Sequence, residues 1–85
     1  MQAKELTIQS ADGLRASKAA MFVQIAGKYS SRILVEKGNK KIDAKSIMGV
    51  LSLGVKQGEK IYVFANGEDE EEAIAALEKL VNTSL

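Results

Sequence analysis

The chain contains no cysteine and no histidine among its 85 residues. The absence of cysteine excludes disulfide bonds and thiolate chemistry. The absence of both residue types also removes the usual ligands of a zinc or haem site. Catalysis would have to use lysine, serine or carboxylate side chains, and no convergent set of them is evident. We therefore expect neither an enzyme nor a bound cofactor or metal.

Aromatic side chains are scarce as well. The chain has only Phe22, Tyr29, Tyr62 and Phe64, and the apolar spacing around Phe22 predicts that this residue lies in the core. A small α+β protein with a basic half can bind RNA, but such binding uses exposed aromatic rings on which bases stack. We therefore expect no direct contact with nucleic acid.

Long apolar runs are also missing, and none approaches the roughly 20 residues of a membrane-spanning helix. The first ten residues have the pattern of a strand and not that of a secretory signal peptide. A hydrophobic fraction of 46% and a charged fraction of 27% are typical of a globular protein. We expect residues 1–85 to form a single cytoplasmic domain without membrane insertion.

The net charge of +1 is unevenly distributed along the chain. Residues 1–58 contain ten Lys or Arg and four Asp or Glu, which gives +6, whereas residues 59–85 contain two and seven, which gives −5. The two values sum to the net charge of the whole chain. The first part is suited to an acidic partner or a phosphate group, although a solvated surface explains the same charge.

Hydrophobic periodicity predicts four strands and three helices in the order β-α-β-β-α-β-α. The predicted strands are Lys4–Ser10, Arg32–Lys37, Lys40–Asp43 and Lys60–Asn66. The predicted helices are Ala16–Ala26, Ile47–Leu53 and a last helix that begins after Asp69. The simplest arrangement is an α+β fold, in which one antiparallel sheet has all three helices on one face.

Several residues predict where these helices begin and end. Ser46 suits the N-cap of the second helix, and Gly27 is placed to end the first. Asp69 and Glu72 resemble a capping box, and acidic residues in a first turn suit the helix dipole. We therefore assign the acidic run no functional role. Gly49 costs about 1 kcal/mol relative to alanine inside a helix, which indicates close packing at that position.

Two short segments look suited to phosphate. Gly13–Ala20 and Lys45–Val50 each place a hydroxyl group and at least one cation where a helix is predicted to begin. Helix N-termini offer free backbone N–H groups and a partial positive charge, and both attract anions.

These segments resemble the HPr family, the small phosphocarriers of the bacterial sugar phosphotransferase system. The resemblance covers essentially the whole chain, and the region around Ser46 is similar to the regulatory-serine region of the Gram-positive branch. It implies an HPr-like open-faced β-sandwich, the architecture that the element order also predicts. The matching stretches are Gly13-Leu14, Ala19–Gln24, Lys45–Gly49, Leu51–Val55 and Gly67–Ala73.

The chain departs from the family at the phosphocarrier centre, where the family pattern is Gly-Leu-His-Ala-Arg-Pro. Arg15 replaces the histidine, Ser17 the arginine and Lys18 the proline. A guanidinium group is permanently protonated and has no lone pair with which to accept a phosphoryl group. A phosphoserine ester at Ser17 would be too inert for a relay. The chain is thus more similar to the catabolite-repression HPr-like proteins (Crh), which lack the histidine and keep the serine.

The resemblance implies that Ser46 is phosphorylated by HPr kinase/phosphorylase. The phosphoprotein would then act in carbon catabolite regulation as corepressor of a transcription factor of the catabolite control protein A type. Ile47, Met48 and Leu51 would form an apolar docking patch for such a partner. The alternatives are that Ser46 is only a helix cap and that the apolar residues belong to the core.

Four further residues are candidate partner-binding residues: Arg15, Ser17 and Lys18 at the start of the first helix, and Lys45 beside the regulatory serine. Arg15 and Lys18 would keep this face cationic for an acidic partner or a phosphate group, and solvated charge is again the alternative. A second hypothesis is a decoy protein. It would dock to enzyme I or to sugar-specific phosphotransferase components without accepting phosphate, and would so compete with the true carrier.

Overall fold

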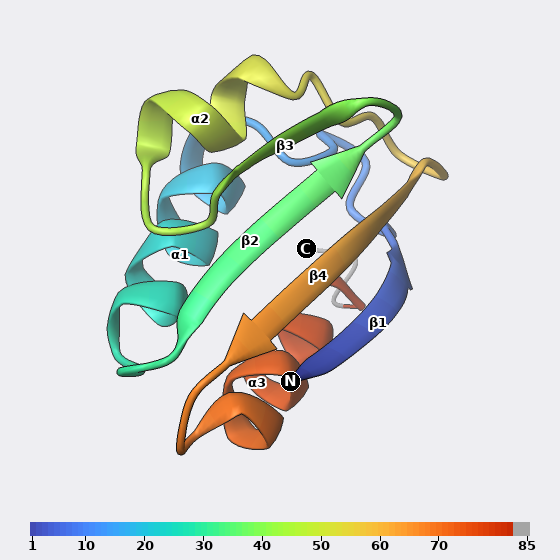
Figure 1. Ribbon diagram of the computed structural model, residues 1–85. Coiled ribbons are helices and arrows are strands. Elements are labelled where there is room, and N and C mark those ends of the chain that lie inside the picture. The colour runs from blue at the N-terminus through green and yellow to red at the C-terminus, as the bar shows by residue number, and fades with distance from the viewer. Residues whose placement is uncertain (83–85) are drawn as a thin grey trace.

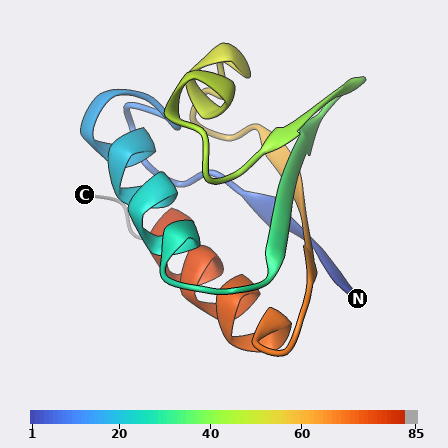
Figure 2. The same ribbon diagram turned by 60° about the vertical axis from the view of Figure 1, so that its left-hand side comes forward.

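The computed structural model describes residues 1–82, apart from the side chain of Ala16. Its strands form one antiparallel sheet in the order β1-β4-β2-β3. The three helices cover one face of this sheet and leave the other face open (Figures 1 and 2). This arrangement confirms the predicted α+β open-faced β-sandwich. The elements are β1 (Gln2–Thr7), α1 (Ala16–Gly27), β2 (Arg32–Lys37), β3 (Lys40–Asp43), α2 (Ile47–Ser52), β4 (Lys60–Asn66) and α3 (Glu70–Val81).

Buried and exposed side chains alternate along β4 and so distinguish the two faces of the sheet. Ile61, Val63 and Ala65 are buried beneath the helices, whereas Tyr62 and Phe64 alternate with them and lie on the open face. Successive side chains of a strand point to opposite faces, and this period made β4 the clearest strand of the sequence. The observed bounds of β2, β3 and β4 are the predicted ones.

The core lies between the helices and the sheet. In α1 the helical spacing of Ala19, Phe22, Val23 and Ala26 predicts one inward face. Ala19, Phe22 and Ala26 are completely buried, and Val23 is half-buried against the core. α3 contributes five buried apolar residues to the same core: Ala73, Ile74, Leu77, Leu80 and Val81. Both helices therefore contribute apolar stripes to one continuous core.

Four boundaries differ from the prediction: both ends of β1, the end of α1 and the end of α2. β1 begins at Gln2 and ends at Thr7, because its exposed first residues pair with β4 without any hydrophobic alternation to reveal them. α1 includes Gly27, which does not adopt the left-handed conformation that ends a helix. α2 ends close to the predicted position, and Gly54 follows it with a φ of 59°.

The predicted capping box between Asp69 and Glu72 is wrong. Asp69 stands at the N-cap position of α3, but its side chain makes no capping hydrogen bond. Its carboxylate instead accepts hydrogen bonds from the backbone N–H of Ser30 at 2.8 Å, and from the backbone N–H and hydroxyl of Ser31 at 2.9 and 2.5 Å. Asp69 thus ties the segment before α3 to the segment between α1 and β2.

These hydrogen bonds predict a pH-dependent stability. The Ser31 hydroxyl and then the Ser30 N–H lower the pKa of Asp69 to about 2. A carboxyl group whose pKa is lower in the folded state stabilises the fold above its unfolded pKa, near 4, and this contribution disappears as the pH falls through the folded pKa. We expect Asp69→Asn to be less stable than the parent at pH 7, with the difference shrinking towards pH 2.

Urea unfolding of both proteins at several pH values between about 7 and 2 measures this difference. Glu68→Gln is the matched control, because it removes the neighbouring exposed acid and should keep the parental pH dependence. A parental pH profile in Asp69→Asn would contradict the assignment.

Candidate functional site

The predicted site residues come from two neighbouring elements. α2 packs against α1, and the start of α1 lies at the same end of the molecule as α2 (Figures 1 and 2). The two segments that looked suited to phosphate are therefore on the same side of the fold.

Gly13 shapes the loop that leads into α1. Its φ is 67°, in the left-handed region that glycine favours, and a Cβ atom at this position would overlap the carbonyl oxygen of Val55. The N–H of Leu14 donates to that same carbonyl oxygen at 3.0 Å. The loop therefore approaches the backbone before β4 closely, and this contact sets the position of Arg15.

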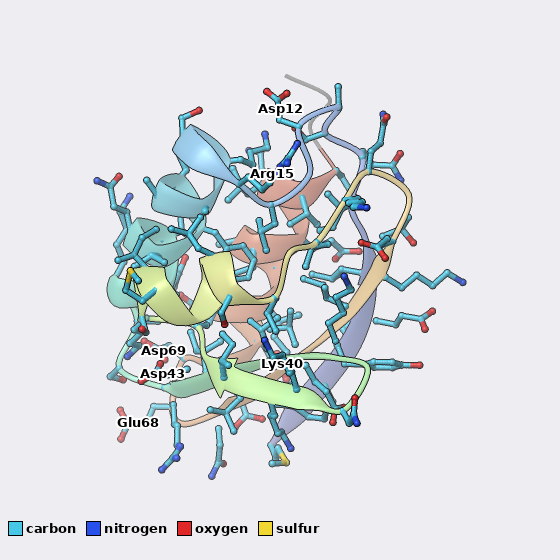
Figure 3. The ribbon with its side chains drawn as sticks, turned by 90° about the horizontal axis from the view of Figure 1, so that it is seen from above. Asp12, Arg15, Lys40, Asp43, Glu68 and Asp69 are labelled. Atoms are coloured by element: carbon cyan, nitrogen blue, oxygen red, sulfur yellow. The ribbon has the colours of Figure 1, made fainter. Side chains whose placement is uncertain are left out.

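Arg15 is the N-cap residue of α1 and its side chain is exposed. Its Nε atom donates to the backbone carbonyl oxygen of Asp12 at 3.1 Å, so that the guanidinium group folds back over its own loop (Figure 3). Ser17 is exposed in the first turn of the helix. The position that the family gives to its phosphocarrier histidine is thus occupied by an accessible cation.

Lys18 requires a correction. Its side chain is only 6% exposed, although the sequence placed it among the docking cations. It lies one helical turn before Phe22, so it falls on the same flank of α1 as a buried residue. A side chain buried to this extent does not provide a docking contact on the surface, and the accessible residues at the start of α1 are Arg15 and Ser17.

Ser46 is the N-cap residue of α2, as predicted. Its Oγ atom accepts a hydrogen bond from the N–H of Gly49 at 3.2 Å, and the residue is half-buried. A Cβ atom on Gly49 would lie 3.3 Å from the Cβ atom of Ile42 and 3.4 Å from the Oγ atom of Ser46. Glycine therefore lets α2 rest on β3 and keeps the space around the hydroxyl group open.

Two lysine side chains bind backbone carbonyl groups at the C-terminal end of α2. Lys37 donates to the carbonyl oxygens of Leu53 and Gly54 at 3.2 and 3.1 Å, and Lys40 donates to that of Ser52 at 3.0 Å. Cations at a helix C-terminus satisfy unpaired carbonyl groups and complement the helix dipole. These contacts fix the end of the helix and were not foreseen from the sequence.

Lys45, the predicted cation beside Ser46, is exposed and makes a hydrogen bond within the protein. Its Nζ atom donates to the backbone carbonyl oxygen of Tyr29 at 2.7 Å. The lysine thus connects the start of α2 to the turn that follows α1, and its ammonium group remains at the surface.

The apolar residues of α2 separate into a buried and an exposed set. Val50 is completely buried, whereas Ile47, Met48 and Leu51 are 39%, 74% and 40% exposed. The alternative that these three residues are part of the core is therefore wrong. An exposed apolar cluster of this kind is typical of a protein interaction site, although binding itself stays a prediction. Met21 of α1 is a further exposed apolar residue, at 45%, that the sequence did not single out.

Within residues 1–82, no group of three or more acidic side chains is placed so that it could hold a metal ion. No helix in this part of the chain is both long and apolar enough to cross a bilayer.

Comparison with known proteins identifies the family. Residues 2–83 match the family described as PTS HPr component phosphorylation site. The HPr-like protein Crh of Halalkalibacterium halodurans is 44% identical over 77 residues, which are 91% of this chain and 92% of the relative.

Solved structures agree with this match. HPr-C-His from Thermoanaerobacter tengcongensis has 54% identity and a TM-score of 0.94, covering 96% of this chain and 92% of that structure. The phosphocarrier protein HPr of Bacillus anthracis has 40% identity and a TM-score of 0.92, covering 94% and 95%. The chain therefore belongs to the HPr family of the phosphotransferase system, and carries Arg15 where the phosphocarrier pattern has histidine.

Proposed function

We propose that this protein is a regulatory member of the HPr family that is phosphorylated on Ser46 by HPr kinase/phosphorylase. In its phosphorylated form it binds a transcription factor of the catabolite control protein A type in the cytoplasm. The observation that carries the proposal is the position of Ser46, which is only half-buried and directly precedes the exposed side chains of Ile47 and Met48.

The surroundings of Ser46 are compatible with a phosphate group. The first turn of α2 contains no acidic residue, and the N–H of Gly49 already points at the Oγ atom. The nearest acidic residue in the sequence, Asp43, accepts a hydrogen bond from the backbone N–H of Lys45 at 2.9 Å. A phosphate at a helix N-terminus is favourable, so modification would add a charged recognition feature next to the apolar patch without unfolding the helix.

The chemistry at Arg15 argues against the phosphocarrier function, which is the other function of the family. A phosphocarrier needs a nucleophile whose phosphorylated form stays reactive, and a protonated guanidinium group provides none. Regulation through Ser46 does not need that nucleophile.

The test is the intact mass of the protein after incubation with HPr kinase/phosphorylase and ATP, with enzyme I and phosphoenolpyruvate in a parallel arm. We expect one added phosphate in the kinase arm alone, absent in Ser46→Ala and retained in Ser52→Ala. Ser52 is a matched control, because it is an exposed serine of the same helix whose hydroxyl donates to the Gly49 carbonyl oxygen at 2.6 Å. Loss of an N-cap costs about 1 kcal/mol, so a thermal melt must show that Ser46→Ala is folded.

The second step of this experiment concerns the partner. The phosphorylated protein should bind the transcription factor at least about tenfold more tightly than the unmodified protein, a difference of about 1.4 kcal/mol. Met48→Ser should weaken that binding and leave the phosphorylated mass unchanged, because it alters the apolar patch and not the modified hydroxyl. Equal binding of both forms would contradict the proposal.

A decoy protein is the second candidate. It is favoured by the close structural match to a phosphocarrier protein over 94% of the chain together with the missing nucleophile. No phosphate in either arm, with slower phosphotransfer by a true carrier when this protein is in excess, would support it. Unchanged transfer rates would reject it.

A further inference from the structure

The sequence contains one asparagine that is followed by glycine, at Asn66-Gly67. The other two asparagines, Asn39 and Asn82, precede lysine and threonine. The backbone nitrogen after an asparagine can attack the asparagine side chain, and glycine leaves that nitrogen unshielded because it has no Cβ atom. Asparagine is for this reason a thermolabile residue. Asn66 is the asparagine whose sequence context favours this reaction most, and it has no part in the proposed function.

Asn66 is exposed and lies where β4 leaves the sheet. It is the last residue of the strand, and its register partner on one side is Arg32 of β2. The register with β1, on the other side, begins at Ala65 opposite Gln2. Ring closure turns the backbone at Asn66 out of the extended conformation, and the end of a strand opens locally more readily than its interior. The position of Asn66 therefore permits the attack.

A carboxylate holds the nitrogen that would attack. The N–H of Gly67 donates to Oε1 of Glu70 at 3.1 Å, and Oε2 of Glu70 forms an ion pair with the N-terminal ammonium group of Met1 at 3.0 Å. The attack requires the Gly67 nitrogen to leave this hydrogen bond and to lose its proton, and a nearby negative charge opposes that loss. Glu70 is therefore placed to slow the reaction that the sequence favours.

We propose that Asn66 is a site of spontaneous deamidation whose rate is set by Glu70. The backbone nitrogen of Gly67 bonds to the side-chain carbonyl carbon of Asn66, and the amide nitrogen leaves as ammonia with the proton of the N–H group. Water then opens the resulting succinimide ring at one of its two carbonyl carbons. Opening at the side-chain carbonyl gives aspartate. Opening at the main-chain carbonyl gives isoaspartate, in which the chain continues through the side chain.

The two products differ in how well they fit the fold. Aspartate at position 66 would stand opposite Arg32, and opposite charges in a cross-strand pair are favourable. Isoaspartate lengthens the main chain just before Gly67, where a Cβ atom would lie only 2.7 Å from the Cα atom of Ser31. Asp69 also ties this connection to Ser30 and Ser31. We therefore expect aspartate to be tolerated and isoaspartate to disturb the connection between β4 and α3 (Figure 1).

The experiment follows the protein by peptide mapping and mass during incubation at mildly alkaline pH, because deamidation raises the mass of the affected peptide by one dalton. We expect Asn66 to be converted first, with the exposed Asn39 and Asn82 as internal controls. In Glu70→Ala the rate at Asn66 should rise at least about fivefold, as the loss of one hydrogen bond predicts. Glu71→Ala is the matched control, because it removes an exposed acid of the same first turn and should stay near the parental rate.

Glu70→Gln keeps an acceptor oxygen without the charge, and its rate should lie between those of the parent and Glu70→Ala. A thermal melt shows whether Glu70→Ala is folded, and Glu70→Gln decides the role of the carboxylate if it is not. Conversion of Asn66 no faster than that of Asn39 would overturn the site. Parental rates in both Glu70 variants would overturn the restraint.

The products are separated by chromatography and compared by urea unfolding, with Asn66→Asp as the reference for the aspartate form. The isoaspartate form should unfold at a lower urea concentration than Asn66→Asp. An equal or higher concentration would contradict the close fit of the connection at Gly67. None of these outcomes depends on phosphorylation of Ser46.

Discussion

Replacing Gly13 by alanine is expected to lower the free energy of unfolding by about 3 kcal/mol or more. The left-handed φ of 67° costs a residue with a side chain about 1–2 kcal/mol. The added Cβ atom would also overlap the carbonyl oxygen of Val55, a backbone atom that cannot rotate away. Relieving that overlap would separate the two segments and weaken the hydrogen bond from the Leu14 N–H to the same oxygen, a further loss of about 1 kcal/mol.

Gly38→Ala is the matched control for this prediction. Its φ is 62°, but no heavy atom lies within 4 Å of an added Cβ atom. It should therefore show the conformational cost alone, about 1–2 kcal/mol. Urea unfolding of both variants at neutral pH measures the difference, which isolates the overlap with Val55. Equal losses in the two variants would show that the close approach of this loop contributes nothing.

Arg15→His combined with Ser17→Arg is expected to give a protein that takes about one phosphate per molecule from phosphoenolpyruvate, because it supplies the missing nucleophile. We expect the parent to take none. An imidazole at position 15 would stand at the N-terminus of α1, whose first turn contains no acidic residue. That position favours the neutral imidazole and the negative charge of the transferred group. The backbone of the loop needs no change, because Gly13 and Leu14 already match the family pattern.

The readout is intact mass after incubation with enzyme I and phosphoenolpyruvate, before and after mild acid. A phosphoramidate on histidine is lost in acid, whereas a serine ester is retained, so the treatment identifies the modified atom. Arg32→His is the control, because Arg32 is an exposed arginine on the sheet and should remain unmodified after substitution. No phosphate in the double variant would mean that features beyond residues 15 and 17 have been lost.

The fold was predictable from the sequence where local signals determine the structure. Alternation defined Arg32–Lys37 and Lys60–Asn66 to the residue, and the N-cap at Ser46 fixed the start of α2. A cap or an alternating strand depends on residues close in the chain, which is why these predictions succeeded. The family resemblance singled out Ser46 and Arg15, and the structure places the starts of α1 and α2 on one side of the molecule.

What the sequence could not show depends on residues distant in the chain. The carboxylate of Asp69 binds Ser30 and Ser31, which are 39 and 38 residues away, and no local pattern indicates this choice over a capping box. Lys18 was taken for a surface charge because lysine is seldom buried, yet its position on α1 places it in the interior.

The lysines at the end of α2 bear on how a partner would be recognised. A helix of six residues is not stable in isolation, but Lys37 and Lys40 bind the backbone carbonyl groups with which it ends. The backbone that carries Ile47, Met48 and Leu51 is thus fixed before any partner arrives. Because little backbone conformational entropy remains to be lost on association, even a small apolar surface of this kind is preorganised for binding.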